Sequence, residues 1–418
     1  MQICKSWCII VVMKLVTTVS QIRDNFTNLY GKVKLEQMDR YDKLFCKFFE
    51  MTGKRLCYVA SSGGRVELVG NHTDHNGGKV MGASVSLDVA ACFLPRSDGR
   101  VFIRTQGFRD IVIDVNGDLT QVEPTSRGMI RGILRYLKEN GYVVGGFSAY
   151  LHSTIPSGAG ISSSAAFQML VAQIQNHLYN DGKIDNLTLA KAGQYAENVY
   201  FNKPCGLMDQ TVVLTGGVVC MDFATNTITC LDAQLPNCQI VVVNTGKSHS
   251  RLNEHYATIP AEMKQVANAF GKDLLSQVDR DQFYSQRDAL AEKLSPRAIL
   301  RAEHFFEENE RVERAWEQLQ TGNFAFASQL QQSGQSSVSK LQNCHYEGGD
   351  TTLIDAINTL SQLNPNGATR VHGGGFAGTV LCIVPLAEKH QFVAKATELF
   401  GAENVHQLKI RNVGTVVL

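Results

Sequence analysis

The chain has 418 residues, of which 44% are hydrophobic, and its 40 Lys and Arg residues against 39 Asp and Glu residues leave a formal net charge of +1. This length suits two or three domains of about 150 residues each, and the balanced charge, without a long run of one sign, argues against nucleic acid or an anionic membrane surface as a partner. The 11 cysteines are scattered singly, without a CxxC pair or a Cys/His cluster at metal-ligand spacing, and this pattern predicts buried free thiols in a reducing cytoplasm.

Residues 1–17 are predicted to form an N-terminal extension that need not be ordered. Their apolar patch, from Trp7 to Met13, lies between Lys5 and Lys14 and is much shorter than the roughly 20 residues that span a bilayer. No convincing signal-peptide cleavage site follows the patch. An upstream extension on a protein that could equally begin at Met13 is the favoured interpretation, and a short anchor that touches a membrane is the alternative.

The first part of the chain begins with helices and continues with strands. From about residue 18 to 54 the apolar residues recur at helical spacing, and then the period changes to two in segments such as RLCYVA, RVELVG, SVSLDVAACFL and RVFIRT. A helix at 129–141, a strand at 145–153 and a helix at 187–201 follow. Residues 212–231 are predicted to return to strand.

A composition shift near LDAQLP, residues 231–236, divides the chain into predicted domains at 18–235 and 236–418. The second domain has a strand at 239–245, a largely helical stretch from about 252 to 343, and then helix, strand, helix and strand to the C-terminus. Helices and strands are too mixed for a simple parallel doubly wound sheet. The predicted fold class is therefore α+β, with two domains.

Residues 154–170, TIPSGAGISSSAAFQML, place a run of small side chains directly before an apolar helical segment. We call residues 154–162 the small-residue loop. Gly158 and Gly160 allow a ligand to approach the main chain, and Ser162, Ser163 and Ser164 lie where the free N–H groups and the positive end of the helix dipole face the loop. Such a helix start attracts phosphate. The alternative is a Ser-capped helix whose glycines only turn the chain.

Two further stretches are rich in glycine. GGRVELVGNHTDHNGG, at 63–78, gathers Arg65, His72, Asp74 and His75 around glycines, and RVHGGGFAGTVLCIV, at 370–384, has three consecutive glycines before a strand. We call residues 70–78 the histidine loop and residues 373–378 the glycine loop. Each stretch alone has a simpler alternative, namely a metal pair at His72 and His75 without a third ligand nearby, or a tight turn.

Together and in this order, the three loops resemble the GHMP small-molecule kinases and, within them, the galactokinase family. A fourth stretch, AENVYFNKPCGLMDQ at 196–210, resembles the family segment that ends in the catalytic Asp. The resemblance covers the chain from about residue 40 to the C-terminus. It implies the two-domain GHMP kinase fold, in which a domain like domain 2 of ribosomal protein S5 precedes a ferredoxin-like domain and the active site lies between them.

The resemblance also implies a function, the transfer of the γ-phosphoryl group of ATP to the anomeric hydroxyl of galactose with Mg²⁺ as cofactor. Such a transfer needs positioning, neutralisation of phosphate charge and a group that handles the hydroxyl proton. The enzyme is expected to be cytoplasmic, and a monomer or a weak homo-oligomer. Its expected partners are the sugar and ATP.

Carried over residue by residue, the resemblance assigns roles in this site. Asp209 would be the base or would orient the anomeric hydroxyl, Arg65 would stabilise charge on the transferred group, and Ser163 with Glu197 would bind Mg²⁺. The sugar would contact Asn71, His72, Asp74, the backbone of Gly206, and Tyr256. ATP would contact Pro156, Gly158, Ala159, Gly160, Ile161, Ser162, Ser163, Ser164, Gly374 and Gly375.

Alternatives remain for these assignments. Asp209 could be a structural N-cap, Arg65 a surface ion pair and Glu197 an exposed helix charge. Asn71 stands where most of the family has a sugar-contacting Glu, so that a related sugar such as N-acetylgalactosamine, galacturonate or arabinose is an alternative substrate. A sugar- and ATP-binding regulator without turnover is a further alternative, although the small-residue loop, Arg65 and Asp209 are all present.

Overall fold

The computed structural model describes residues 15–156, 158–202, 205–246, 253–345, 351–376 and 378–418. The predicted N-terminal extension lies outside these residues except at 15–17, where Val16 is buried and forms an antiparallel bridge with Cys57. Eight of the nine described cysteines carry free thiols, and Cys46 is the one of these that is exposed. Cys230 is disulfide-bonded, so the prediction of free thiols is wrong at that position. None of the helices in the described part of the chain is both long and apolar enough to cross a membrane.

The larger sheet of the described residues has eight strands in the order β12-β1-β2-β5-β3-β4, with β6 and β7 attached to β2. Its pairs are antiparallel except for β3 with β5. The strands are β1 (Tyr58–Val69), β2 (Lys79–Arg96), β3 (Arg100–Thr105), β4 (Ile111–Asp114), β5 (Gly146–Ser153), β6 (Val218–Asp222), β7 (Thr227–Leu231) and β12 (Val416–Val417).

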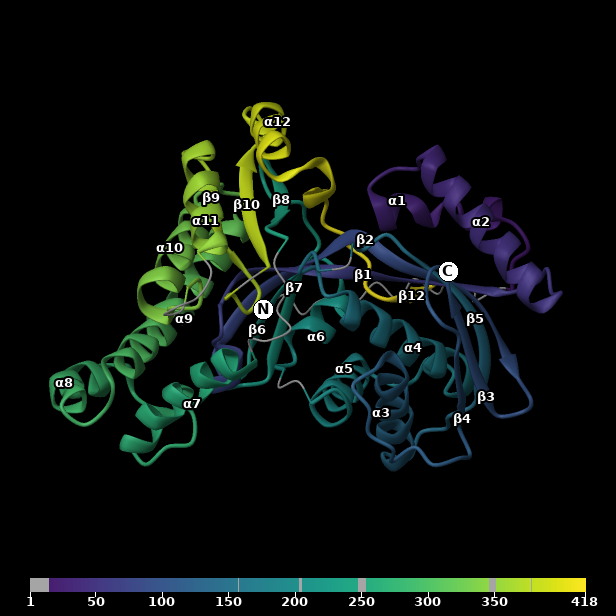
Figure 1. Ribbon diagram of the computed structural model, residues 1–418, viewed down its shortest axis with the longest axis horizontal. Helices are drawn as coiled ribbons and strands as arrows, with labels where there is room; N and C mark the ends of the chain where they lie inside the picture. The colour runs from purple at the N-terminus through teal and green to yellow at the C-terminus, as the bar shows by residue number, and fades with distance from the viewer. Residues whose placement is uncertain (1–14, 157, 203–204, 247–252, 346–350, 377) are drawn as a thin grey trace.

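Helices cover both faces of the larger sheet (Figure 1). Because side chains alternate along a strand, Ala90 and Cys92 of β2 pack in one cluster with the N-terminal helices, whereas Ala91 and Phe93 pack in the other cluster. The N-terminal helices are η1 (Val19–Ile22), α1 (Asn25–Tyr30) and α2 (Leu35–Thr52), and the other face carries α3 (Ser126–Glu139), α4 (Ser163–Tyr179), α5 (Asn186–Tyr195), η3 (Ala196–Tyr200) and α6 (Met208–Thr215).

The smaller sheet has the antiparallel order β11-β8-β10-β9. Val241 and Val243 of β8 face α11 and α12, whereas Ile240 and Val242 face α9 and α10. The strands are β8 (Cys238–Asn244), β9 (Ala368–His372), β10 (Thr379–Pro385) and β11 (Val405–Leu408). The helices are α7 (Asn253–Ala269), η4 (Leu275–Gln277), α8 (Arg280–Ala291), α9 (Pro296–Gln320), α10 (Phe326–Ser336), η5 (Ser337–Leu341), α11 (Thr352–Leu363), α12 (Lys389–Phe400) and η6 (Ala402–Asn404), with η2 (Asp74–Asn76) in the first half.

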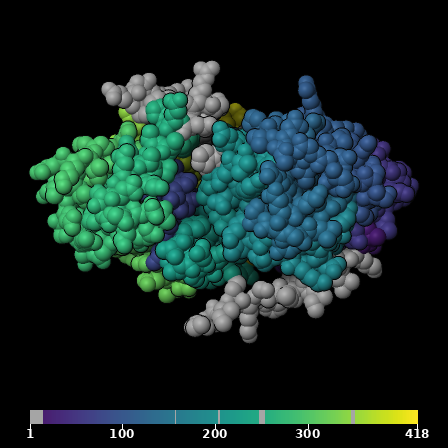
Figure 2. Space-filling model, turned by 90° about the horizontal axis from the view of Figure 1, so that it is seen from below, coloured from purple at the N-terminus to yellow at the C-terminus, as the bar shows by residue number. Residues whose placement is uncertain are grey.

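The two halves of the chain lie side by side. In Figure 2 the surfaces of the second half (green) and the first half (blue and teal) adjoin, and a strip of purple-blue chain is visible between them. The α+β fold class is confirmed. The boundary at residues 235 and 236 stays a prediction; the smaller sheet starts at Cys238, and β12 returns to the larger sheet beside β1.

One predicted element is wrong in part. Residues 212–215 were expected in a strand, but they form the end of α6, and the strands β6 and β7 begin only after Gly216 and Gly217. The valines at 212 and 213 are fully buried against the larger sheet and α4. Burial therefore decides the conformation of these β-branched residues, and intrinsic preference does not.

A buried charge cluster fastens the N-terminal helices and the last residues to the larger sheet. Asp88 of β2 is fully buried and accepts hydrogen bonds from Arg40 at 2.6 Å and Tyr30 at 2.7 Å, and from Ser61, with Arg411 at 3.5 Å. Burial alone would raise the pKa of Asp88, but the guanidinium groups of Arg40 and Arg411 hold it below its ordinary value. The cluster joins segments more than 300 residues apart because none of these charges can be buried alone.

We predict that Asp88→Ala lowers the free energy of unfolding by about 3–5 kcal/mol, since it leaves two buried guanidinium groups without their carboxylate. Urea unfolding followed by circular dichroism measures this loss. The matched control is Asp110→Ala, which removes a carboxylate paired with Arg104 at the surface and is expected to change the midpoint little. Equal losses in the two variants would contradict a special role for the buried cluster.

Candidate active site

Arg65 lies on β1 directly after an irregularity in the pairing with β2 at Gly63 and Gly64. A Cβ atom at Gly64 would lie 2.6 Å from the carbonyl oxygen of Ile161, so only glycine lets the small-residue loop pack this closely on the strand. The backbone N–H of Arg65 donates to the same carbonyl at 3.1 Å. The strand and the loop are therefore joined where the Arg65 side chain begins.

The Arg65 guanidinium binds Asp209 through two hydrogen bonds. Nε donates to Oδ1 at 2.6 Å and Nη2 donates to Oδ2 at 2.7 Å, while Nη1 donates to the carbonyl oxygen of Gly160 at 2.7 Å. The hydroxyl of Ser162 donates to Asp209 Oδ2 as well. The Arg65 side chain is 8% exposed and that of Asp209 is 27% exposed. The two residues expected to be catalytic thus form one ion pair, held by the small-residue loop and open to solvent on the Asp209 side.

The small-residue loop ends at the N-terminus of α4, as predicted. Its last residue, Ser162, has a left-handed backbone with φ 53° and makes no side-chain hydrogen bond to the helix. Its hydroxyl binds Asp209 instead, which leaves the first N–H groups of α4 to other partners. Ser163 is exposed and Ser164 is half-buried. This helix start has the properties of an anion site.

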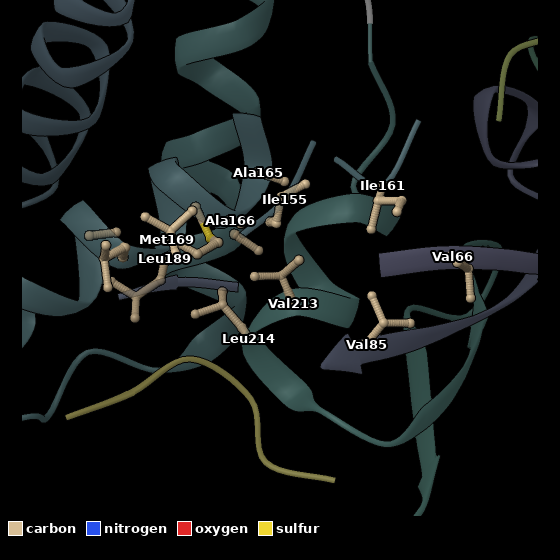
Figure 3. Close-up of a cluster of buried hydrophobic side chains, with 14 of the residues drawn as sticks. Val66, Val85, Ile155, Ile161, Ala165, Ala166, Met169, Leu189, Val213 and Leu214 are labelled. Atoms are coloured by element: carbon tan, nitrogen blue, oxygen red, sulfur yellow. The ribbon is translucent and has the colours of Figure 1, made fainter. Parts of the chain in front are cut away.

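Other residues of the loop contribute through the backbone. The side chains of Ala159 and Ile161 are 1% exposed and belong to the core of the larger sheet, and Ile161 is seen there with Val66 and Ala165 (Figure 3). Pro156 accepts a hydrogen bond from the N–H of Ala159. Gly158 and Gly160 both have positive φ. The apolar residues therefore anchor the loop, while Gly158 is exposed and Gly160 and Ser162 are half-buried.

The histidine loop brings His72 and Asp74 to the same region. A Cβ atom at Gly206 would lie 1.7 Å from Asp74 Oδ2. The backbone of Gly206 is therefore packed against the Asp74 carboxylate. His72 Nε2 donates to the carbonyl oxygen of Gly374 at 2.9 Å, which makes Nδ1 the acceptor, and Nδ1 is buried without a partner among the described residues. Burial lowers the pKa of His72 to about 3. His72 is therefore a neutral ring whose acceptor nitrogen has no partner among the described residues.

Glu308 of α9 holds the start of the histidine loop. Its Oε1 accepts from the backbone N–H groups of Gly70 at 2.9 Å and Asn71 at 3.1 Å, and from the hydroxyl of Ser333, while Arg311 binds its Oε2 at 2.6 Å. Burial opposes ionisation, yet His304, Arg311 and Arg370 lower the pKa of Glu308 to about 2. Glu308 was not predicted from the sequence. The spacing of Arg301, His304, Glu308 and Arg311 along one helix face was the signal that could have revealed it.

Asn71 and Tyr256 are predicted to contact the sugar, but the side chains of both are hydrogen-bonded to other residues of the chain. The Asn71 side chain donates to Glu67 and to the Gly373 carbonyl, and accepts from Ser337 and Asn343. A sugar hydroxyl can bond Asn71 only by displacing one of these partners.

Tyr256 of α7 packs against the glycine loop. Its hydroxyl donates to the carbonyl oxygen of Gly375 at 2.7 Å, and a Cβ atom at Gly374 would lie 2.4 Å from its ring. Burial raises the pKa of Tyr256. Gly375 is packed on its other side by Asn343, so both predicted nucleotide-binding glycines are fixed by neighbouring side chains.

Ser163 and Glu197 supply oxygen donors of the kind that Mg²⁺ prefers, a hydroxyl and a carboxylate. Glu197 lies in η3, is 3% exposed, and accepts a hydrogen bond from Gln168 of α4 at 2.9 Å. Ser163 is thus the first residue of α4, Glu197 contacts the same helix through Gln168, and the chemistry of both side chains fits the ion. Among the described residues no three His, Cys, Asp or Glu side chains form a metal cluster, so His72 and His75 gain no third ligand of these types.

Two family models match parts of this chain, and curated relatives match most of it. The model of the GHMP kinases N terminal domain matches residues 128–217, and that of the galactokinase galactose-binding signature matches residues 43–95. A galactokinase from Limosilactobacillus reuteri (strain DSM 20016) is 30% identical over 368 residues, which cover 84% of this chain and 91% of the relative, and one from Clostridium tetani is 28% identical over 380 residues, which cover 88% and 94%.

Solved structures share the fold. The crystal structure of Lactococcus lactis galactokinase complexed with galactose superposes with a TM-score of 0.75 at 22% identity, covering 96% of this chain and 100% of that chain. Methanococcus jannaschii mevalonate kinase gives a TM-score of 0.60 at 14% identity, covering 85% and 98%.

We predict that Glu308→Gln lowers stability in a pH-dependent way. Because the folded pKa of Glu308 is lowered to about 2 from its ordinary value of 4.5, its charge stabilises the fold above about pH 4.5, and this contribution is lost as the pH falls toward 2. The variant is expected to lose about 3 kcal/mol at pH 7 and less at pH 3, as measured by chemical unfolding at both values.

The matched control is Glu313→Gln, on the same helix with a side chain that is 52% exposed. It is expected to change stability little at either pH. A cost for Glu308→Gln that is the same at pH 7 and pH 3 would contradict the role of the ionised carboxylate.

Proposed function

Because this chain belongs to the galactokinase family of the GHMP kinases, we propose that it transfers the γ-phosphoryl group of ATP to the anomeric hydroxyl of galactose, giving galactose 1-phosphate and ADP. The observation that carries the proposal is the ion pair between Arg65 and Asp209, which lies against both the small-residue loop and the start of α4. An anion site, a carboxylate and a guanidinium are together what phosphoryl transfer to a hydroxyl needs.

ATP is proposed to bind with its phosphates at the start of α4. The free N–H groups of that helix and the backbone of Gly158 and Gly160 offer donors, and the exposed hydroxyl of Ser163 lies at the first turn. Mg²⁺ bound by Ser163 and Glu197 would neutralise charge on the phosphate oxygens. Gly374 and Gly375 of the glycine loop are proposed to border the nucleotide from the second half.

The sugar is proposed to bind between Asp74, His72 and Gly206. A carboxylate can accept from two adjacent hydroxyls, and the acceptor Nδ1 of the neutral His72 ring suits a third. The backbone of Gly206 closes the site on the other side of Asp74. This set of acceptors favours a polyhydroxylated substrate.

Asp209 is proposed to accept the proton of the anomeric hydroxyl or to orient that hydroxyl. The anomeric oxygen then attacks the γ-phosphorus, a new P–O bond forms, and the bond to the bridging oxygen of ADP breaks. Arg65 stabilises the charge on the transferred group while it holds Asp209 in position.

We also propose that the enzyme acts in the cytoplasm as a monomer or a weak homo-oligomer, a location supported by the free thiols of eight described cysteines. A kinase for a related sugar, such as N-acetylgalactosamine, galacturonate or arabinose, is the second candidate, and the observation that favours it is Asn71 at the family's Glu position. The Asn71 side chain is occupied by protein partners, which leaves the far hydroxyl of the sugar without its usual contact.

We predict that purified protein with ATP and Mg²⁺ releases ADP in the presence of galactose, and that Asp209→Asn lowers kcat by about 10²- to 10⁴-fold because the group that handles the proton is lost. A coupled assay with galactose, N-acetylgalactosamine, galacturonate and arabinose compares kcat/KM among the sugars. If the native protein releases ADP no faster than Asp209→Asn with every one of these sugars, the proposal is wrong.

We predict further that Gly206→Ala raises the KM for galactose by about tenfold or more, a loss of about 1.4 kcal/mol, because the added methyl group pushes Asp74 out of place. The KM for ATP is expected to stay unchanged. The control is Gly117→Ala, where φ is not positive and the nearest atom lies 3.4 Å from the added Cβ. An equal rise in the KM for ATP would contradict a sugar site at Gly206.

A further inference from the structure

The histidine loop and the glycine loop are hydrogen-bonded to each other. Asn71 Nδ2 donates to the carbonyl oxygen of Gly373 at 2.8 Å, and His72 Nε2 donates to that of Gly374 at 2.9 Å. Asn343 connects the two as well, since its Nδ2 reaches Asn71 Oδ1 at 2.8 Å and the Gly374 carbonyl at 3.1 Å. The loop assigned to the sugar therefore cannot move without the loop assigned to the nucleotide.

Asn71 is central to this connection. It is 1% exposed, and both its donor positions and both acceptor positions of its amide oxygen have protein partners. Its backbone is fixed too, because the N–H donates to Glu308 and the carbonyl oxygen accepts from His304. Because all these hydrogen bonds are made at once, a movement of either loop is expected to move Asn71 and, with it, the other loop.

The glycine loop is in turn joined to the small-residue loop. A Cβ atom at Gly160 would lie 2.3 Å from Thr379 Oγ1 and 3.1 Å from His372 Nδ1. His372 Nε2 accepts from the backbone N–H of Glu67 at 3.1 Å, and its Nδ1 donates to Thr379. His372 and Thr379 lie at the two ends of the glycine loop, so the contact reaches the proposed phosphate site.

An amide is required at position 71 by its neighbours. Glu67 Oε1 accepts from Asn71 at 2.9 Å and from Arg370 at 2.7 Å, and Glu67 is 5% exposed. A carboxylate at position 71 would meet the Glu67 carboxylate and the Gly373 carbonyl with no proton to donate. Two buried carboxylates this close repel each other.

We propose that Asn71 is a positioning residue that couples sugar binding to nucleotide binding by fixing the histidine loop to the glycine loop. The inference rests on the proposed function, since it takes the two loops to serve the two substrates. A displacement of the glycine loop on nucleotide binding passes through the Asn71 hydrogen bonds to the histidine loop, so the two ligands favour the same arrangement of both loops. By reciprocity, the sugar tightens nucleotide binding by the same factor.

The test is calorimetric titration of galactose with and without a saturating non-hydrolysable ATP analogue and Mg²⁺. In the native protein the analogue is expected to tighten galactose binding about fivefold or more, and the reverse titration is expected to give the same factor. Asn71→Ala is expected to bring the factor close to one. The matched control is Asn76→Ala, since Asn76 is a buried amide of the same loop whose side chain binds Met263, and it is expected to keep the native factor.

A second pair of variants separates coupling from stability. Asn71→Asp is expected to lower Tm and abolish coupling, because it places two carboxylates together. Adding Glu67→Gln restores one amide and one carboxylate, so Tm is expected to recover by at least half. The carboxylate at position 71 of that double variant still cannot donate to the Gly373 carbonyl, and the coupling factor is expected to stay near one.

The outcomes are distinct. No galactose binding by the native protein would defeat the proposed function. Native binding with a coupling factor of one, or a native factor retained in Asn71→Ala, would overturn this inference alone. Recovery of coupling together with Tm in the double variant would also overturn it, because the bond to Gly373 would then be unnecessary.

Discussion

The bidentate ion pair of Arg65 with Asp209 is the interaction on which the site depends. Arg65 is almost fully buried, and a buried guanidinium without a carboxylate would cost several kcal/mol. The pair therefore requires that β1, the small-residue loop and the start of α6 meet at one point. Glycine at position 64 and the Ser162 hydroxyl allow this meeting, because the first removes a steric conflict and the second completes the hydrogen bonds of Asp209.

Around this pair, the second half of the chain supports the first. The residues that would touch the sugar come from the histidine loop, yet their backbone is held by Glu308 of α9 and by the glycine loop. Glu308 and the glycine loop are held by buried charges or by several hydrogen bonds, and they fix the geometry of the histidine loop. A substitution among these residues is therefore expected to disturb that geometry. The proposed reaction centre thus draws residues from both halves of the chain, which are organised around different sheets.

Much of the site could be predicted from the sequence because its signals are local. Small residues before an apolar helical segment predicted the helix start, and the family resemblance assigned Arg65 and Asp209 to one site. The structure places Arg65 and Ser162 within hydrogen-bond distance of Asp209. The environment of Asn71 could not be predicted, because its partners Ser337 and Asn343 lie more than 260 residues away. The pairing of β12 with β1 could not be predicted for the same reason. For Glu308 the helical spacing was a signal, but its bonds to the backbone of Gly70 and Asn71 were not predictable. The strand prediction for residues 212–215 was wrong for another reason, because their burial in α6 outweighs the β preference of the two valines.

The most direct measurement of the central claim is a crystal structure of the protein with galactose and a non-hydrolysable ATP analogue. We expect the anomeric oxygen to lie within hydrogen-bond distance of Asp209, about 3 Å, with the terminal phosphate between the start of α4 and the Arg65 guanidinium. Clear density for both ligands with the sugar or the terminal phosphate away from this ion pair would contradict the claim.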